Sequence, residues 1–315
     1  MKPPSADLRS LVSSAIDFAD QTYFLGPEVE PPPLSLVNSI REYGILLPPL
    51  VQQQNTGKCI VVAGWKRLIT AFTILHWNGV PCIVVPADCP PLYLYSILLE
   101  HSLLGRPLSL AEQSTFFAKA RESSTAEDIL PLLAKMGHRP NKFQLDELLG
   151  LRNLAPSAFL ALHRGNLNYT GARKLLRIAQ VDQESLLALI TRFQISGSKQ
   201  QNVIDLSTEL LRREQRPLED ITAPFLEQMD MPRQENIPQQ AAALLNWLHG
   251  KCFPRSVRAE NEFCRRVAQL NLPTTVQIAH SPSFEDDSVT LTLKFADWGS
   301  LQKSLSGIHQ ILAPR

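Results

Sequence analysis

The chain has 315 residues, of which 44% are hydrophobic and 19% are charged, and its formal net charge at pH 7 is +1. This length predicts two or three domains, and this composition excludes a chain that is disordered throughout. No run approaches the ~18 consecutive apolar residues of a membrane span, so we expect no membrane partner, and the near-zero net charge does not by itself indicate a polyanion.

The cysteines indicate a reducing compartment. There are five of them, without CxxC spacing: Cys59, Cys82, Cys89, Cys252 and Cys264. A disulfide framework is not expected in a chain of this length, and Cys59 and Cys82 lie inside apolar runs, as small buried hydrophobes do. The residues after Met1 contain no apolar signal core, so we expect a cytoplasmic protein.

The N-terminal third is predicted to contain a small mixed α/β domain. Residues 1–33 are expected to be a loosely held lead-in that ends at Pro31–Pro33, because three prolines cannot continue a helix. The domain itself covers 34–107. It should hold a short helix closed by Gly44, and then, in chain order, an extended segment over 46–53, a strand over 58–63, a helix over 65–77 and a strand over 80–85.

The start of the helix at residue 65 carries the most specific local chemistry. Gly64 and Trp65 lead into two cations, Lys66 and Arg67. Free N–H groups, the positive end of the helix dipole and two cationic side chains would meet there, which suits a phosphate. The plainer interpretation is that Lys66 and Arg67 form surface ion pairs and that Gly64 only makes a tight turn.

Residues 108–216 are predicted to be wholly helical. Ser109, with Glu112 three residues later, has the form of a capping box at a helix start. A helix–turn–helix is predicted further on, with a helix over 129–136, a turn at 137–141 and a second helix over 142–151. Any two packed helices can produce this pattern, so it does not establish DNA binding by itself.

The same region holds a local excess of positive charge. Between residues 135 and 177 only Asp146 and Glu147 are acidic. The basic residues there are Lys135, Arg139, Lys142, Arg152, Arg164, Arg173, Lys174 and Arg177. Such a patch attracts a phosphate backbone, and the alternative is a solvated helical face.

The C-terminal part is predicted to be a linker followed by a small α+β unit. Residues 217–238 are polar with scattered prolines, which indicates the linker. The unit at 239–315 should hold helices over 239–249 and 256–270, then two strands, and a last helix that Asp297 caps and that bears Leu301, Leu305, Ile308 and Leu312. Two strands and one helix do not close a core, so we expect a second copy of the chain to complete it.

Several short motifs resemble those of the ParB partition-protein family. That family pairs an SIxxxGxxxPxxV segment with a GxRRxxA helix start, and carries a GxLxxxxARxLL segment after its helix–turn–helix. The matching segments here are Ser39–Gly44 with Pro48–Val51, Gly64–Ala71 and Gly165–Leu176. The resemblance covers residues 18–211. It implies an α+β protein with a ParB-like N-terminal domain, an all-helical helix–turn–helix domain and a small C-terminal dimerisation unit.

The resemblance also implies a site for CTP and Mg²⁺. In the family, the GxRR helix start and a later ENxxR segment hold the nucleotide, which closes a dimeric clamp over DNA. Glu100 would be the metal ligand. The residues at the matching positions are Gly64, Trp65, Lys66, Arg67, Glu100, His101 and Arg106.

Four positions depart from the family pattern. Lys66 keeps a positive charge but loses the bidentate fork of arginine, and Trp65 replaces a glutamate, where it either stacks on a ligand or packs. His101 stands where the family has asparagine, and imidazole does not suit Mg²⁺. Leu47 replaces the Gln or Asn of CTP-hydrolysing members and cannot orient a water, so we expect weak CTPase activity at most.

Double-stranded DNA is the partner that the resemblance implies. Lys142 and Gln144, near the start of the second helix of the motif, would read bases in the major groove. A homodimer, a partition ATPase partner and a nucleoid-associated location complete this expectation, for a role in DNA segregation or transcriptional regulation. The residues expected to bind phosphates are Arg139, Arg152, Arg173, Lys174 and Arg177.

Two other functions remain open. A ParB-like domain without nucleotide could serve as an adaptor that binds proteins, a reading favoured by the departures described above and by Asp146 and Glu147 on the presumed recognition helix. Sulfiredoxins resemble ParB domains and carry out phosphoryl chemistry, but they need a cysteine at the helix start. Here Trp65 and Lys66 occupy that position, and the nearest cysteine is Cys59.

Overall fold

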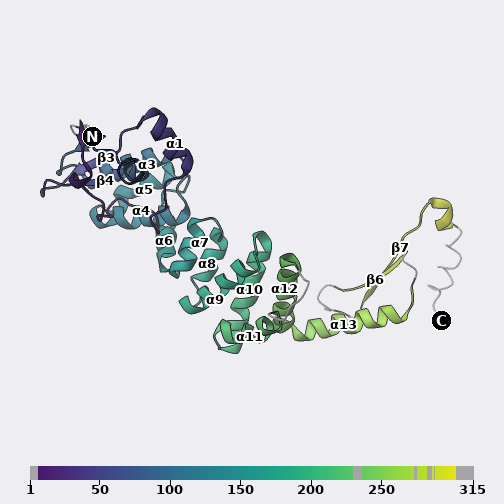
Figure 1. Ribbon diagram of the computed structural model, residues 1–315. Helices are drawn as coiled ribbons and strands as arrows, with labels where there is room; N and C mark the ends of the chain where they lie inside the picture. Colours follow the sequence, from purple (N-terminus) through teal and green to yellow (C-terminus); the bar gives the residue numbers. More distant parts are fainter. Residues whose placement is uncertain (1–5, 230–235, 273–274, 282–285, 287, 303–315) are drawn as a thin grey trace. The chain divides into compact units, whose positions relative to one another are not determined.

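The computed structural model of the protein describes residues 6–229, 236–272, 275–281, 286 and 288–302 (Figure 1). The chain forms two compact units. Unit 1 contains Met1–Thr208 and Arg216–Thr222, and unit 2 contains Glu209–Gln215 and Ala223–Arg315. Helices and sheets coexist, so the α+β fold class is confirmed. Within the described ranges, no helix combines the length and the apolar character needed to cross a membrane.

A five-stranded mixed sheet lies at the centre of the N-terminal part of unit 1 (Figure 1). Strand β3 lies antiparallel to β4 and parallel to β5, and every residue of β4 is buried. The apolar run that predicted β4 therefore forms the middle of the core. The strands, in the spatial order β1-β5-β3-β4-β2, are β1 (Asp7–Leu11), β5 (Val80–Val85), β3 (Leu50–Gln53), β4 (Cys59–Ala63) and β2 (Ile16–Asp17).

The prediction that residues 1–33 are a loosely held lead-in is wrong for the described part of that segment. β1 pairs antiparallel with β5, β2 pairs parallel with β4, and the short 3-10 turn η1 (Ser13–Ala15) joins them. Tyr23 and Leu25, further along, are buried. Four of the five residues of β1 are exposed, so this edge strand has no apolar alternation to reveal it.

Helix α2 (Trp65–Ile69) and its continuation pack against this sheet through Leu68 and Ala71, and helix α1 (Leu34–Tyr43) packs against that continuation. Helix α1 ends at Gly44, whose φ is 74°. Helix α2 continues as a π-helical turn, η2 (Thr70–Ile74), in which the Leu75 N–H donates to the Thr70 carbonyl at 2.9 Å. The predicted helix over 65–77 is therefore shorter and ends in a wider turn. Such π turns are frequent at functional sites.

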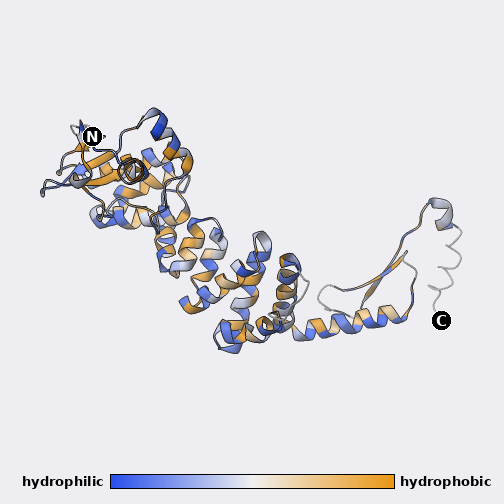
Figure 2. Ribbon diagram, in the orientation of Figure 1, coloured by the Kyte–Doolittle hydropathy of each residue, from blue (hydrophilic) through white to orange (hydrophobic). Residues whose placement is uncertain are grey.

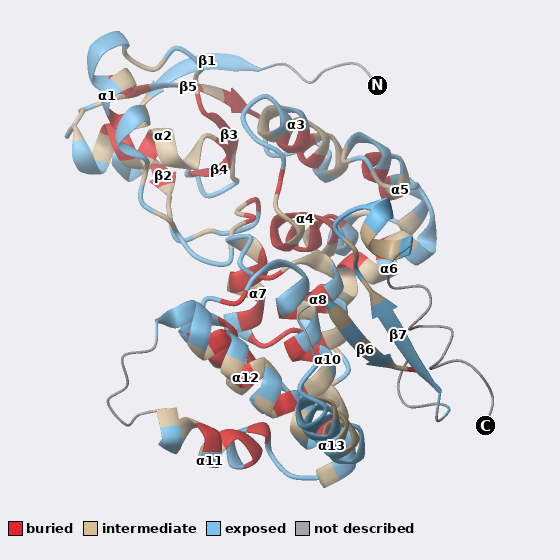
Figure 3. Ribbon diagram, turned by 90° about the vertical axis from the view of Figure 1, so that its right-hand side faces the viewer, coloured by how far each residue is buried: buried red, intermediate tan, exposed pale blue. Residues whose placement is uncertain are grey.

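The middle of unit 1 is helical, as predicted. Helix α4 (Leu110–Ser123) is buried along most of its length and packs against α3, α5, α6 and α7 (Figure 3). Its capping box between Ser109 and Glu112 is confirmed. The other elements are α3 (Pro91–Leu103), α5 (Ala126–Lys135), α6 (Lys142–Gly150), the 3-10 turn η3 (Leu151–Asn153), α7 (Pro156–His163), α8 (Tyr169–Leu175), α9 (Gln180–Arg192) and α10 (Gly197–Glu214), whose residues from Glu209 onward belong to unit 2.

The predicted linker over 217–238 is wrong in its first half. Residues Leu218–Met229 form helix α11, and Leu218, Ile221 and Phe225 are buried. Pro217 lies just before the helix, where no backbone N–H is needed, and Pro224 lies inside it. Two prolines among polar residues therefore gave the appearance of a linker, although every third or fourth residue is apolar.

Unit 2 contains the C-terminal helices and a hairpin. These are α12 (Ile237–Cys252), α13 (Pro254–Gln269), β6 (Val276–His280) and β7 (Val289–Leu293), with β6 antiparallel to β7. Polar and apolar residues alternate along α13, none of which is buried (Figure 2). Asp297 accepts the Ser300 N–H at 2.8 Å, as a helix cap does. The rest of the predicted last helix, with Leu305, Ile308 and Leu312, lies outside the described residues.

Candidate functional site

A cavity of about 550 Å³ lies where the sheet of unit 1 meets its helical part. Its wall is formed by the chain before α1, the β4–α2 connection, the end of α3, the start of α4 and the end of α7. This volume suits a small-molecule ligand. The wall is mostly apolar, and its charged and other strongly polar residues are Glu28, Glu30, Lys66, Arg67, His101, Ser102, Arg106, Glu112 and His163.

Gly64 is required at the entrance to α2. Its φ is 95°, in the left-handed region, where an L side chain is strained. A Cβ on Gly64 would also lie 2.9 Å from Arg67 Nη2 and 3.0 Å from Pro49 Cα. The backbone therefore approaches its neighbours closely here, which goes beyond the tight turn of the plainer interpretation.

Arg67 is held by neighbouring groups rather than left free. Its guanidinium donates to the Leu47 carbonyl oxygen and to Nε2 of His101. Burial lowers the pKa of Arg67. Burial, and then the Arg67 charge, lowers the pKa of His101, so the imidazole is neutral and accepts the hydrogen bond. His101 thus positions an arginine, a role that the sequence did not indicate.

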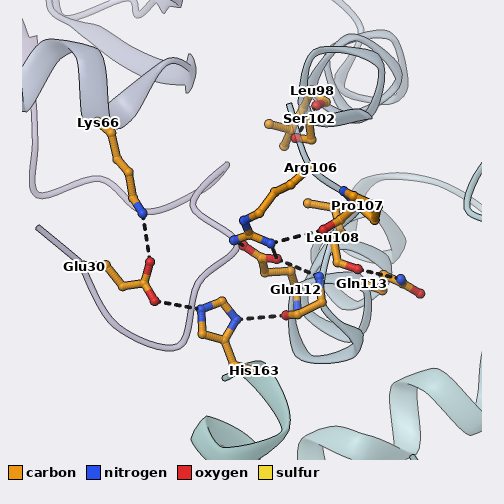
Figure 4. Close-up of polar contacts among 11 residues, drawn as sticks. Glu30, Lys66, Leu98, Ser102, Arg106, Pro107, Leu108, Glu112, Gln113 and His163 are labelled. Carbon is orange, nitrogen blue, oxygen red and sulfur yellow. Dashed lines mark hydrogen bonds and ion pairs between the residues drawn. The ribbon is translucent and has the colours of Figure 1, made fainter. Parts of the chain in front are cut away.

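Arg106 is bound to Glu112 by two parallel hydrogen bonds of 2.8 and 2.7 Å (Figure 4). The hydrogen bond to Glu112 raises the pKa of Arg106. Burial alone would raise the pKa of Glu112, but hydrogen bonds from Arg106 and from the Ser109 N–H hold it below its usual value. Glu112 therefore serves the α4 capping box and this pair at once.

Lys66 belongs to a chain of contacts that crosses the cavity wall (Figure 4). Its ammonium lies 2.8 Å from Oε2 of Glu30, and Oε1 of Glu30 lies 3.3 Å from Nε2 of His163. Nδ1 of His163 lies 2.8 Å from the Ser109 hydroxyl. The contacts join the segment before α1, the start of α2, the end of α7 and the cap of α4. Neither Glu30 nor His163 is part of a motif, so sequence reasoning missed both.

Of the predicted nucleotide-site residues, Glu100 alone lies outside the cavity wall, and Trp65 lies in the wall but is packed among aromatic rings. The Glu100 carboxylate pairs with Lys135, and Glu100 is not part of the cavity wall. Trp65 packs against Phe18 and Phe24, with ring centroids 5.8 and 5.4 Å away. Its indole N–H is buried and, among the described atoms, finds no hydrogen-bond acceptor.

The cavity fits a nucleotide in size but does not fit a magnesium triphosphate. Lys66 and Arg106 are each neutralised by a carboxylate, and Arg67 is engaged with His101. Glu100, the predicted metal ligand, is turned to Lys135. Over the described residues, no three His, Cys, Asp or Glu side chains gather as a metal site requires.

The predicted helix–turn–helix consists of α5, a turn and α6, packed on α4. Gly137 in the turn has a φ of 83°, and His138 Nε2 lies 2.6 Å from Gln113 Oε1 on α4. The Asn141 side chain caps α6 by accepting the Gln144 N–H at 2.8 Å. Lys142 is exposed, and so is Phe143, whose 69% exposure is unusual for an aromatic side chain. Phe143 is a candidate that the sequence analysis missed.

The predicted phosphate-binding residues divide into two groups. Arg173 pairs with Glu147 at 2.7 Å, and Lys174 pairs with Asp205 at 2.6 Å. These two residues are thus at least partly structural. The others are exposed and have no ion pair with any residue that the structure describes: Arg139, Lys142, Arg152 and Arg177.

Solved structures of ParB proteins are similar to this chain. The C-terminally truncated chromosome-partitioning protein ParB from Caulobacter crescentus, complexed to the centromeric parS site, is 19% identical, with 57% of this chain and 90% of that chain covered and a TM-score of 0.33. The same protein complexed with CTP-gamma-S is 22% identical, with 55% and 94% covered and a TM-score of 0.26.

A Pnob8-like ParB-N domain is also similar. It is 16% identical, with 68% of this chain and 84% of that chain covered and a TM-score of 0.34. No family model and no curated protein sequence matches this chain. These similarities concern the fold alone.

Proposed function

We propose that the protein is a ParB-like protein that binds double-stranded DNA through its helix–turn–helix. The observation that carries this proposal is the exposed first turn of α6, where Lys142 and Phe143 project from a helix start that Asn141 caps. The first turn of a recognition helix is the part that meets base edges in the major groove. Lys142 offers a donor to guanine, and Phe143 an apolar contact to the thymine methyl group.

Three exposed cations would supply the part of the DNA affinity that does not depend on sequence. Arg139 and Arg152 flank α6 in sequence, and Arg177 follows α8. None of the three has an ion pair with a described residue, so each is available to a phosphate. Each phosphate contact releases condensed counterions, which makes the affinity fall with salt.

The experiment is a comparison of base readout. DNA fragments that the protein enriches from a random pool are bound by the wild type and by Phe143→Ala. We expect the variant to lose about tenfold in affinity for the enriched sequence and little for unrelated DNA, since the loss of recognition at one base pair typically costs about 1–3 kcal/mol. Val181→Ala is the matched control, because Val181 on α9 is 64% exposed. Equal losses of affinity for the enriched and the unrelated DNA would show that Phe143 does not contact bases.

The remaining features of a partition protein are part of the same proposal. The C-terminal unit (239–315) would pair with a second copy, so that two helical domains (108–216) meet one duplex, as in a dimeric clamp. The cavity beside α2 would take CTP or another anionic ligand, without a metal role for Glu100. A partition ATPase as partner and a nucleoid-associated, cytoplasmic location would follow from such a role, in DNA segregation or in transcriptional regulation.

The adaptor function is a second candidate. It is favoured by α6 itself, because exposed Asp146 lies 3.8 Å from Arg121 and would repel a phosphate backbone. Salt-sensitive DNA binding distinguishes the DNA-binding function from the adaptor.

A sulfiredoxin-like enzyme is disfavoured. Cys59 is buried in β4, and burial raises its pKa, which disfavours the thiolate form that such chemistry needs.

A further inference from the structure

Glu30 makes an unusual pair of contacts. One carboxylate oxygen lies 2.8 Å from Lys66 Nζ, and the other lies 3.3 Å from Nε2 of His163 (Figure 4). Lys66 is at the start of α2, beside the sheet, while His163 ends α7 in the helical part. Two donors that are 97 positions apart in sequence therefore converge on a single anion at the cavity wall.

His163 is prepared to bind an anion in this position. Only 5% of its side chain is exposed. The Ser109 hydroxyl accepts the Glu112 N–H at 3.2 Å, which leaves its own proton for Nδ1 of His163, 2.8 Å away. A hydroxyl that donates to Nδ1 selects the tautomer with its proton on Nε2, the nitrogen that faces Glu30. The imidazole thus presents an N–H donor on Nε2 to an oxyanion.

Glu30 differs from the groups that hold it in the kind of segment that carries it. It belongs to the chain before α1 rather than to a helix or strand, and its side chain is 34% exposed, against 41% for Lys66 and 5% for His163. Lys66 and His163, in contrast, lie on α2 and α7. The donors therefore form a built site, while the carboxylate is a group that can leave it.

We propose that Lys66 and His163 form an anion-binding site that the carboxylate of Glu30 fills in the ligand-free protein, and that a phosphoryl or carboxylate group of a ligand takes its place. This inference rests on the ligand cavity of the proposed function and identifies how that cavity receives an anion. It also explains why the cavity does not fit a magnesium triphosphate, because the Glu30 carboxylate already occupies Lys66 at the start of α2.

The exchange has a structural consequence that can be observed. A ligand oxyanion would keep Lys66 and His163 bridged, while the chain around Glu30 would lose one of its anchors. Glu28 would remain paired with Arg164. Amide hydrogen exchange of the segment 28–30 should therefore rise when ligand binds, whereas that of α7 should not.

The test is the binding of inorganic pyrophosphate and of CTP, both without metal, to the full-length protein by calorimetry. Glu30→Gln removes the internal anion with little change in shape. We expect this variant to bind pyrophosphate about tenfold more tightly than the wild type, a change of ~1.4 kcal/mol. CTP should gain by a similar factor if its phosphates use this site, and combining Glu30→Gln with Lys66→Met should abolish the gain.

Glu209→Gln is the matched control, since Glu209 also has an ion-pair partner, Arg212 at 2.7 Å, but does not line the cavity. Its pyrophosphate affinity should stay within twofold of the wild type. The proposal is overturned if Glu30→Gln binds no more tightly than the wild type, if Glu209→Gln gains equally, or if neither probe binds either protein at millimolar concentration. DNA affinity, measured separately, tests the proposed function, so the two failures are distinguishable.

Discussion

Gly64 combines a left-handed backbone with a crowded surrounding, and these two effects can be separated by substitution. Gly57 has a similar φ of 82° but nothing within 4 Å of a Cβ, so Gly57→Ala should cost only the backbone strain, about 1–2 kcal/mol. Gly64→Ala adds the contacts with Pro49, for which overpacking costs about 1–3 kcal/mol more. Urea unfolding measures the stability of both variants, and an equal loss in the two would show that crowding at Gly64 adds nothing.

The paired Glu112 carboxylate should make the free energy of unfolding fall at acid pH. Its pKa in the folded state lies below the usual value of 4.5. A depressed carboxyl pKa contributes stability that is fully present above about pH 4.5 and is lost as the pH falls through the folded-state pKa. Glu30, whose pKa the Lys66 hydrogen bond lowers, acts in the same direction.

The variant Glu112→Gln should therefore lose part of its acid sensitivity. We expect it to be about 1–3 kcal/mol less stable at pH 7, because it breaks a hydrogen-bonded pair, and to show a smaller difference between pH 7 and pH 4 than the wild type. Denaturant unfolding at the two pH values gives both quantities. An undiminished pH difference would show that Glu112 is not a source of it.

At the scale of the element, the free and the paired cations around α6 should behave differently. Arg177→Glu should lower the slope of log affinity against log salt by about 0.9, the value for one phosphate contact, without changing the free energy of unfolding. Arg173→Glu places a second negative charge beside Glu147. Because Arg173 is half exposed, we expect a modest loss of stability, about 1 kcal/mol or less. A larger effect of Arg173→Glu than of Arg177→Glu on the salt slope would contradict this division.

The elements also show what a sequence can predict. The strand predicted over 80–85 has those bounds, and the capping box at Ser109 forms as expected, because apolar runs and caps are local patterns. β1 was missed since its residues are mostly exposed and its partner, β5, is distant in sequence. α11 was missed because its prolines resemble those of a linker.

The candidate site was predictable only in part. Gly64, Trp65, Lys66 and Arg67 of the motif all line one cavity, and so do His101 and Arg106, whereas their binding of a nucleotide stays a prediction. Their partners were not predictable: Glu30 and Glu112 neutralise two of the cations through contacts that depend on the fold. Charge counts treat a paired and an unpaired arginine alike, so the division between Arg173 and Arg177 also needed the structure.

At the scale of the whole molecule, the proposed pairing of two copies can be tested at the C-terminal unit. Val289 and Leu291 of β7 are 65% and 53% exposed and share one face of the hairpin. If a second copy covers this face, Leu291→Glu should convert a dimer into a monomer in sedimentation analysis, whereas Thr292→Glu on the opposite face should not. A wild-type protein that sediments as a monomer would contradict pairing through this unit.

The most direct test of the account is the affinity of the purified protein for duplex DNA at low and moderate salt, with and without CTP. Three exposed cations assigned to phosphates, Arg139, Arg152 and Arg177, predict that the affinity falls with salt, with a slope of about −2.7 on a log–log plot if each meets one phosphate. CTP should change the affinity if its cavity is coupled to the helical domain. An absence of DNA binding at both salt concentrations, even to pooled genomic fragments, would contradict the proposed function and favour the adaptor.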